Sequence, residues 1–158
     1  MAWGKNGTPL TLGSELDDID ITDLGGKKFN QILYHHLNSG NAGGLLTFND
    51  DGTTNYARRY SYNGGEGTSI NQSAIAYYAN GDVPEFTVSY VVGISTEEKL
   101  MISFNVEQKT AGAGNAPSRF ELVAKWADTS NTLDRIDIHN TLSGSFDISS
   151  NLSVLGTD

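Results

Sequence analysis

The sequence predicts an all-β protein, an antiparallel two-sheet β-sandwich for which a jelly roll is the expected topology. Apolar and polar residues alternate with a period of two along several short runs, which is the pattern of strands with one buried face. These runs are regularly spaced and separated by turn residues in a chain with 18 Gly and 3 Pro, as is typical of two-sheet sandwiches. We expect an extended N-terminal arm over residues 1–13 and a single β-sandwich domain over residues 14–158.

The composition narrows the classes of function. The chain has no Cys, which excludes disulfides, thiolate metal sites and a cysteine nucleophile and fits folding in a reducing cytoplasm. Its formal net charge is -9, from 19 acidic and 10 basic residues. Because an acidic surface repels phosphate, we expect neither nucleic acid nor an anionic membrane as a partner. No run approaches the ~18 apolar residues of a membrane span.

The N-terminal arm is polar and rich in turn residues, with Trp3 as its large aromatic side chain. Trp3 either anchors the arm to a partner or packs over the edge of its own domain, and the sequence leaves both open. The next run, Leu16 to Leu24, alternates with Ile19 and Ile21 inward and aspartates outward. Outward charge suits a strand at the edge of a sheet.

Four runs follow in the first half of the domain. Phe29 to Leu37 fits a helical face or a strand, and its length and Gly-rich flanks favour the strand. Leu45 to Asn49 and Tyr56 to Tyr62 predict two strands, and Asp50-Asp51-Gly52 between them predicts a hairpin turn. Ile70 to Tyr78 fits either a short helix or a strand, and propensity does not separate the two.

The longest alternation runs from Phe86 to Gln108 and predicts a long antiparallel hairpin, broken at Thr96 to Lys99. We expect its apolar side to form the inner wall of the sandwich. Nine apolar side chains, each worth very roughly 1.5–3 kcal/mol when buried, need a second layer over them. The residues expected to face inward are Phe86, Val88, Tyr90, Val92, Ile94, Leu100, Ile102, Phe104 and Val106.

The last strands are expected at Arg119 to Trp126, Leu133 to Asn140, Phe146 to Ile148 and Leu152 to Leu155. In the first of these the inward residues in phase are Phe120, Leu122, Ala124 and Trp126.

Metal and cofactor sites are not expected. The neighbours His35 and His36 point to opposite faces of a strand and cannot chelate one ion, while His139 is far away in sequence. Oxygen-bearing residues between Asn49 and Asn55 are spaced like a calcium loop, but the distal bidentate Glu is missing and ordinary turn chemistry explains them. The sequence contains no HExxH or GxSxG motif and no GxGxxG fingerprint.

An enzyme is not expected either. Glycosidases need two carboxylates roughly 5–9 Å apart, and Glu85, Glu107, Glu121 and Asp137 are the acidic residues that neighbouring strands could supply. The alternation places Glu107 and Glu121 on the face opposite the core, so surface carboxylates are the simpler interpretation.

One strand concentrates residues typical of binding surfaces. Tyr56, Arg58, Tyr60 and Tyr62 share one side, with Arg59 on the other. Tyr and Arg are enriched at interface hot spots, and an aromatic strip can stack on a sugar ring. Lining the core is the third interpretation and is slightly favoured, although a buried arginine would have to be neutralised. With Trp3, these five residues are the candidate interface or glycan contacts.

The C-terminal segment, residues 133–158, resembles a pattern of tailed-phage virion proteins. In that pattern a strand I-x-I-x-N is followed by a Gly, an aromatic residue, a small polar turn, and a closing strand whose final Gly lets the chain leave the sheet. The matching positions are Ile136, Ile138, Asn140, Gly144, Phe146, Ser149, Ser150, Leu152, Val154 and Gly156. Residues 86–126 look like the preceding strands of the same small phage β-domains, and residues 2–9 resemble the start of marine-phage proteins.

The resemblance, which covers about half of the chain, implies a non-enzymatic virion structural protein made in the host cytoplasm. It implies a capsid decoration or head-fibre component on the particle exterior, or a tail-associated (tail fibre) module, with other virion proteins as partners and a homotrimer as the favoured assembly. An acidic surface suits an exterior location, whereas the lack of repeats and heptads departs from long fibres. The alternative is a carbohydrate-binding β-sandwich module for a host surface glycan, with Tyr56, Tyr60, Tyr62 or Trp126 as platforms. A sandwich-class hydrolase is least favoured.

Overall fold

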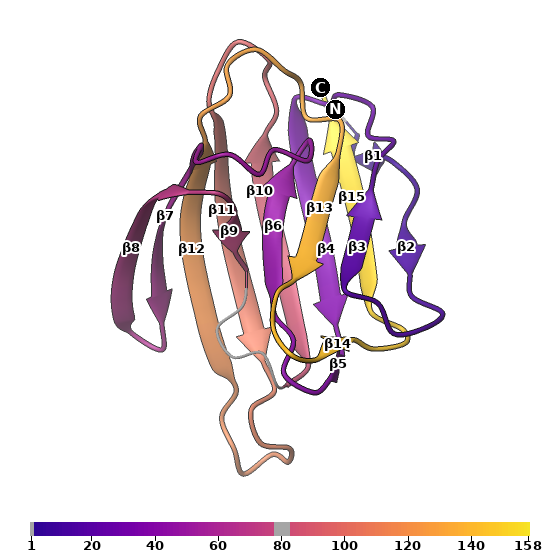
Figure 1. The fold of residues 1–158 in the computed structure, drawn as a ribbon, viewed down its shortest axis with the longest axis vertical. Coiled ribbons are helices and arrows are strands. Elements are labelled where there is room, and N and C mark those ends of the chain that lie inside the picture. Colours follow the sequence, from indigo (N-terminus) through magenta and orange to yellow (C-terminus); the bar gives the residue numbers. More distant parts are fainter. Residues whose placement is uncertain (1, 78–82) are drawn as a thin grey trace.

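Two antiparallel sheets of unequal width pack face to face, and a short ribbon closes one end (Figure 1). The computed structural model describes residues 2–77 and 83–158. The narrow sheet lies over only part of the wide one, and the outer strands of the wide sheet extend beyond it (Figure 1). The predicted all-β, two-sheet sandwich is therefore confirmed. The finer prediction of a jelly roll is not confirmed by this arrangement of nine strands against four.

The strands of the large sheet are β1 (Gly4–Lys5), β2 (Leu10–Thr11), β4 (Phe29–His36), β7 (Tyr56–Tyr62), β8 (Gly65–Gln72), β10 (Glu85–Val92), β11 (Lys99–Glu107), β12 (Ser118–Trp126) and β15 (Asn151–Thr157). Their order is β1-β15-β4-β10-β11-β12-β7-β8, with β2 also paired to β15. The strands of the small sheet are β3 (Asp18–Ile21), β6 (Gly44–Phe48), β9 (Ile75–Ala76) and β13 (Ile136–Asn140), in the order β3-β13-β6-β9. The ribbon pairs β5 (Asn38–Ser39) with β14 (Ser145–Phe146).

The hydrophobic core lies between the small sheet and the inner face of the large sheet. Both predicted inward isoleucines of β3, Ile19 and Ile21, are buried there, and β3 is an edge strand as its outward aspartates indicate. The predicted inward set of β12 is also confirmed as buried, namely Phe120, Leu122, Ala124 and Trp126.

The predicted hairpin between residues 45–49 and 56–62 is wrong. β6 pairs with β13 and β9, whereas β7 pairs with β12 and β8. The turn, with positive φ at Asn49 and Asp50, carries the chain from one sheet to the other. The two strands then meet through side chains, because the Tyr56 hydroxyl accepts a hydrogen bond from the backbone N of Phe48 (3.0 Å) and its ring stacks on Trp126 at 6.3 Å.

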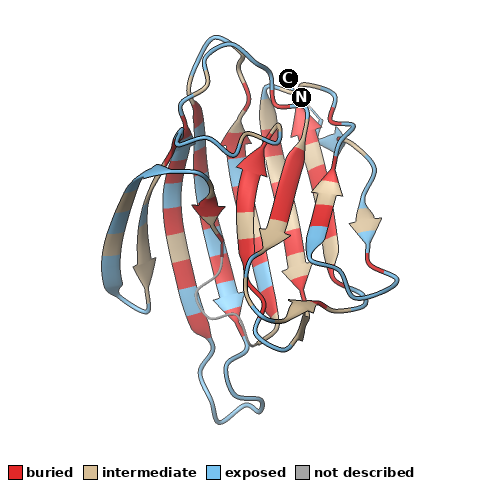
Figure 2. Ribbon diagram, viewed as in Figure 1, coloured by how far each residue is buried: buried red, intermediate tan, exposed pale blue. Residues whose placement is uncertain are grey.

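The long hairpin forms as predicted, with β10 antiparallel to β11 in continuous register. Its orientation is opposite to the prediction. Most of the predicted inward residues, including Phe86, Ile102 and Phe104, are exposed on the outer face of the large sheet, and Val88, Val92 and Ile94 are half-buried. Bands of buried and exposed residues alternate along β11 and β12 in Figure 2.

The physical reason is that the polar side of this hairpin finds partners inside the sandwich. The Tyr77 hydroxyl contacts Ser89 Oγ, which donates in turn to Ser103 Oγ at 2.8 Å. Asn105 Nδ2 donates to Thr87 Oγ1 at 2.9 Å. A buried polar side chain is tolerated when it is hydrogen-bonded. The small side chains of Ser89 and Ser103 also leave space for the Tyr77 ring.

Two ambiguous segments are resolved as strands. Residues 29–37 form β4 and its end, as favoured from the sequence. Residues 70–77 contain the end of β8 and then β9, not a helix, and Tyr78 lies outside the described residues. The N-terminal arm is extended and hydrogen-bonded to its own domain, because β1 and β2 both pair with β15.

Two glycines of the phage-like pattern are required by close contacts. Gly156 does not release the chain from the sheet. It lies inside β15, where a Cβ atom would come within 2.7 Å of the Lys27 side chain. A Cβ on Gly144 would meet backbone atoms of Ser39 and Asn41 at 2.6 and 2.7 Å. Backbone atoms cannot turn aside as a flexible side chain can, so the ribbon tolerates only glycine at Gly144.

Gly144→Ala is therefore expected to lower the free energy of unfolding by about 1–3 kcal/mol, the usual cost of overpacking. Urea unfolding followed by tryptophan fluorescence measures this loss. The matched control is Gly114→Ala, where a Cβ atom would meet nothing within 4 Å. Equal stability of the two variants would contradict the close approach of the β5 and β14 segments.

Candidate interaction surface

The outer face of the large sheet carries a continuous set of large apolar side chains that nothing covers among the described residues. Eight of them are 42–57% exposed, and together they define the outer apolar face. They are Trp3, Phe86, Tyr90, Leu100, Ile102, Phe104, Val106 and Val123.

Strand register makes this face continuous. Phe86 lies opposite Val106, Tyr90 lies opposite Ile102, and Ile102 also lies opposite Val123 on the next strand. Directly opposed residues on one face of a sheet have Cβ atoms about 4.5–5.5 Å apart. The apolar side chains of three adjacent strands therefore touch one another rather than standing alone.

Trp3 extends the face beyond the strands. Its ring packs edge-on against Tyr90 with centroids 6.5 Å apart, and the Tyr90 hydroxyl accepts a hydrogen bond from Gln31 Nε2 at 3.2 Å. Trp3, Phe29 and Tyr90 line a hollow of about 280 Å³. Of the two alternatives for Trp3, the structure shows packing over its own domain, with the residue still 46% exposed.

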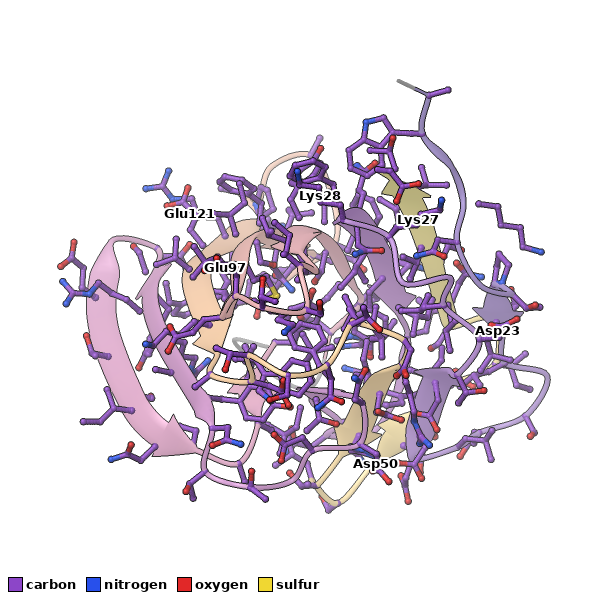
Figure 3. The ribbon with its side chains drawn as sticks, turned by 90° about the horizontal axis from the view of Figure 1, so that it is seen from above. Asp23, Lys27, Lys28, Asp50, Glu97 and Glu121 are labelled. Carbon is purple, nitrogen blue, oxygen red and sulfur yellow. The ribbon has the colours of Figure 1, made fainter. Side chains whose placement is uncertain are left out.

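Charged residues of β12 and of the β10–β11 turn flank the outer apolar face. Arg119 pairs with Glu121 at 3.8 Å, and Lys125 pairs with Glu98 at 2.7 Å. Figure 3, seen from above, places Glu121 on the outer side of the large sheet and Asp50 on the opposite side of the molecule. An apolar centre with a polar rim is the usual anatomy of a protein interface.

The size of the outer apolar face sets it apart from ordinary surface. If a large apolar side chain has roughly 200 Å² of surface, half of that over eight side chains is on the order of 800 Å². The largest apolar patch of a typical monomer is about 300–600 Å². One partner of a standard protein–protein interface buries about 800 Å², so this face has the area of a specific interface.

Tyr56, Arg58, Tyr60 and Tyr62 share the inner side of β7, the slightly favoured of the three interpretations. Tyr56 is 1% exposed and belongs to the core. Arg58 Nη1 donates to the Ala76 carbonyl oxygen at 2.6 Å, and its guanidinium lies 4.6 Å from the Tyr60 ring centroid. The Tyr62 hydroxyl donates to Glu107 Oε2 at 3.2 Å.

Arg59 differs from the other four candidates of β7 because it faces outward. It lies in a shallow hollow of the outer face together with Ile102, Phe104 and Val123. The structure thus brings Trp3 and Arg59 to one surface. It buries Tyr56 and leaves Arg58, Tyr60 and Tyr62 partly buried on the inner side. The alternation in the sequence correctly separated Arg59 from Tyr56, Arg58, Tyr60 and Tyr62. It did not determine which of the two sides of the strand faces the core.

Glu85 and Glu107, two of the carboxylates weighed above as glycosidase candidates, form a buried pair. Glu85 and Glu107 are direct partners across β10 and β11 and are 2% and 0% exposed. The prediction that Glu107 lies opposite the core is wrong, whereas Glu121 does lie on the outer face. Because both paired side chains are closed off from solvent, they lie in the interior rather than in an open cleft.

Burial favours the neutral forms of Glu85 and of its neighbour His36. Burial raises the pKa of Glu85 to about 8, against the lowering effect of the hydrogen bond from Asn105. Burial also lowers the pKa of His36 to about 4. Although His36 Nε2 and Glu85 Oε1 are 3.7 Å apart, they form a neutral pair at pH 7, since two charges would each lose their hydration.

The oxygen-rich turn after β6 is a closed turn rather than a calcium loop. The carboxylate of Asp51 accepts hydrogen bonds from Thr53, from Asn55 and from Trp126 Nε1, the last at 2.6 Å. Burial alone would raise the pKa of Asp51, but these hydrogen bonds outweigh it and lower the pKa to about 2. The carboxylate oxygens thus accept hydrogen bonds from the turn itself and from Trp126 of β12.

Three metal-ligating side chains that the sequence did not connect lie together on the small sheet. One ligand atom each from Asp50, Asp137 and His139 falls within 4.8 Å of the other two. His139 was distant from the other histidines in sequence, and no local spacing could have paired it with a turn 89 positions earlier. The pairing of β13 with β6 brings the two segments together.

Comparisons with known proteins do not assign a family. No family model matches the chain, and neither a curated protein nor a solved structure matches it. Within residues 2–77 and 83–158, no helix is long and apolar enough to cross a membrane.

The raised pKa of Glu85 makes stability depend on pH in a defined window. A folded-state pKa of about 8, above the ordinary 4.5, means that folding favours the protonated form. The stabilisation is complete below pH 4.5 and is lost as the pH rises through 8. The lowered pKa of His36 acts below pH 6.5 with the opposite sign, so Glu85 dominates this pair between pH 6.5 and 8.

In that window we expect the free energy of unfolding to fall by up to about 1.4 kcal/mol per pH unit, measured by urea unfolding at pH 6.5, 7.25 and 8. Glu85→Gln removes the titrating group and should flatten the profile. Glu121→Gln on the outer face is the control and should keep the wild-type slope. Parallel profiles for wild type and Glu85→Gln would contradict a protonated carboxyl in the interior.

Proposed function

We propose that this chain is a non-enzymatic structural protein of a virus particle, a capsid decoration or head-fibre component on the particle exterior. In this proposal, copies of the chain assemble through the outer apolar face. The observation that supports it most directly is that face itself, because a soluble domain that carries it alone would leave an interface-sized apolar surface in water. The phage-like pattern of residues 133–158 supports the virion context.

The free energies favour assembly over an isolated domain. Removing on the order of 800 Å² of apolar surface from water at about 25 cal/mol per Å² gives roughly 20 kcal/mol per chain before costs. Association costs about 4–15 kcal/mol in lost translational and rotational freedom, and ordering of side chains adds to this. A surplus remains when one chain covers another over most of the face.

A second copy of the chain is the partner that this surface fits best. Its identical apolar face matches in area and in chemistry, and its flanking charges of both signs, such as Arg119 and Glu121, can rearrange across an interface. Nucleic acid and anionic membranes fit less well because the net charge is -9. The phage-like pattern favours a trimer among closed assemblies, with other virion proteins bound at the remaining surface.

The structure gives less support to the alternative, a carbohydrate-binding module, because its candidate stacking residues are buried or partly buried. Tyr56 and Trp126 are fully buried. Tyr60 and Tyr62 are partly buried and engaged within the chain, since Arg58 lies over the Tyr60 ring and the Tyr62 hydroxyl donates to Glu107. Trp3 and Tyr90 are the exposed aromatic pair left for such a role. Burial of Glu85 and Glu107 likewise removes the pair on which a hydrolase would depend.

Phe104→Lys is expected to break the assembly without unfolding the domain, because its side chain is exposed at the centre of the outer apolar face. A charge there would be buried unpaired between chains. Light scattering during size-exclusion chromatography measures the molar mass, and wild type should elute with three times the chain mass and the variant with one.

Ile148→Lys is the matched control, since Ile148 is equally exposed but follows β14, away from this face. It should keep the wild-type mass. A wild type that stays monomeric at tens of micromolar would overturn assembly through this face. A wild-type dimer that Phe104→Lys dissociates would keep the interface and reject the trimer.

The virion role has a separate test. Mass spectrometry of purified particles should detect this chain in fixed proportion to the major capsid protein, and gentle proteolysis of intact particles should remove it first, as expected of an exterior component. Absence of the chain from purified particles would overturn the virion role while leaving the oligomer result untouched.

A further inference from the structure

The outer surface of the small sheet, opposite the outer apolar face, concentrates polar and charged side chains. In the strand register Asp20, Asp137 and Thr47 form one row across β3, β13 and β6. Asp18 and His139 form part of the next row. Figure 1 shows β13 between β3 and β6, so its outward side chains lie at the middle of this surface.

The turn after β6 places a third ligand beside this row. The backbone N of Asp50 donates to Asp137 Oδ2 at 3.1 Å, which holds the turn against β13. One ligand atom each of Asp50, Asp137 and His139 then lies within 4.8 Å of the others. A hollow of about 260 Å³ opens at this point, lined by Thr47, Asp50 and His139 among others, and Figure 3 shows Asp50 on this side of the molecule.

The imidazole is oriented for a cation. His139 Nδ1 contacts the carboxylate of Asp18, and because a carboxylate only accepts, Nδ1 is the donor. Nε2 then carries the lone pair of the neutral ring. A carboxylate that fixes the tautomer of a histidine in this way is the usual outer support of a metal-ligating histidine. Arg135 holds Asp137 similarly through Oδ1.

A buried hydroxyl supplies an independent indication of a ligand. Thr47 is only 5% exposed, and its Oγ1 has no hydrogen-bond partner among the described residues. It lines the same hollow as Asp50 and His139 and is the direct strand partner of Asp137. Buried polar groups are almost always satisfied, and an ion with its coordinated water would satisfy this one.

We propose that Asp50, Asp137 and His139 bind one divalent transition-metal ion of the Zn²⁺ class, with the Thr47 hydroxyl bonded to the ion or to its water. The imidazole decides the class, because Ca²⁺ and Mg²⁺ take oxygen ligands whereas Zn²⁺ accepts nitrogen and carboxylate oxygen together. The ion joins the β6–β7 turn to β13. This proposal does not depend on the assembly proposed above.

The charge of the surroundings agrees with a cation. Asp18 and Asp20 lie beside Asp137 and His139 in the register, and with Asp50 they bring the carboxylates facing this surface to four. Arg135 is the arginine that pairs with both Asp20 and Asp137. A divalent ion would offset the remaining negative charge.

Calorimetric titration of the full chain with ZnCl₂, after treatment with a chelator and its removal, tests the proposal. Wild type should bind one ion per chain. His139→Gln and Asp50→Asn should each weaken binding at least tenfold, the loss typical of a removed ligand or its support. Thr47→Val keeps the shape of the side chain, removes the hydroxyl and should weaken binding several-fold.

His35→Gln is the matched control, because His35 is a half-exposed histidine of β4 on the far side of the molecule, and it should bind as wild type does. Urea midpoints measured in chelator establish that each variant is folded. Absence of binding by wild type, equal binding by His139→Gln, or a loss in His35→Gln alone would each overturn the site. Because Asp50 is exposed on a turn, Asp50→Asn tests the site even if the His139 variant does not fold.

Discussion

The nine-stranded sheet is wider than the four-stranded sheet that covers one of its faces. This difference in width determines where the core lies and which apolar side chains stay exposed. A sheet must bury its apolar side chains against a second layer, but four short strands cannot cover both faces of nine. The small sheet lies against one face and completes the core with β3, β6 and β13. The other face remains open, and it is this open face that carries Phe86, Ile102 and Phe104. The proposed assembly with another chain would remove it from water.

The outer face of β10 and β11 is apolar, whereas many of the side chains on their covered inner face are polar. Tyr77, Ser89 and Ser103 form a hydrogen-bonded chain, and Asn105 bridges Glu85 and Thr87. Each hydrogen bond of these networks offsets part of the cost of burying its groups, and removing one member would leave its partner buried without a bond. Among the described residues, Asn105 Oδ1 and Glu85 Oε1 have no hydrogen-bond partner. The polar side of the hairpin faces inward because it supplies hydrogen-bonding groups to the interior, as Ser89 does for the Tyr77 hydroxyl. The apolar side of the hairpin therefore faces outward.

The two outer surfaces of the sandwich therefore have distinct chemistry. One is apolar, broad and flanked by charges of both signs, as befits contact with another protein. The other carries aspartates, a histidine oriented by Asp18, and the Thr47 hydroxyl, which has no hydrogen-bond partner in residues 2–77 and 83–158. A domain that assembles through one surface keeps the other free, so a metal ion on the small sheet and a neighbour on the large sheet are compatible. The ion would tie the turn after β6, which also supplies Asp51 to the buried Trp126, to the middle strand of its sheet.

The sequence by itself determined the alternation along most of the strands and the grouping of residues on common sides, because the period of two is a local property of extended chain. It could therefore predict the sandwich, the β10–β11 hairpin and the shared phase of Tyr56, Arg58, Tyr60 and Tyr62. It left residues 70–77 open between helix and strand and did not predict the first part of β8. Only the tertiary structure decided which side of the hairpin is covered and which strands become neighbours. Apolar side chains can be covered by a second sheet or by a second chain, and polar ones can be buried when distant residues such as Tyr77 supply their hydrogen bonds. Those partners, like the pairing of β13 with β6 that brings His139 to Asp50, are set by contacts between segments far apart in the chain, and no local pattern contains them.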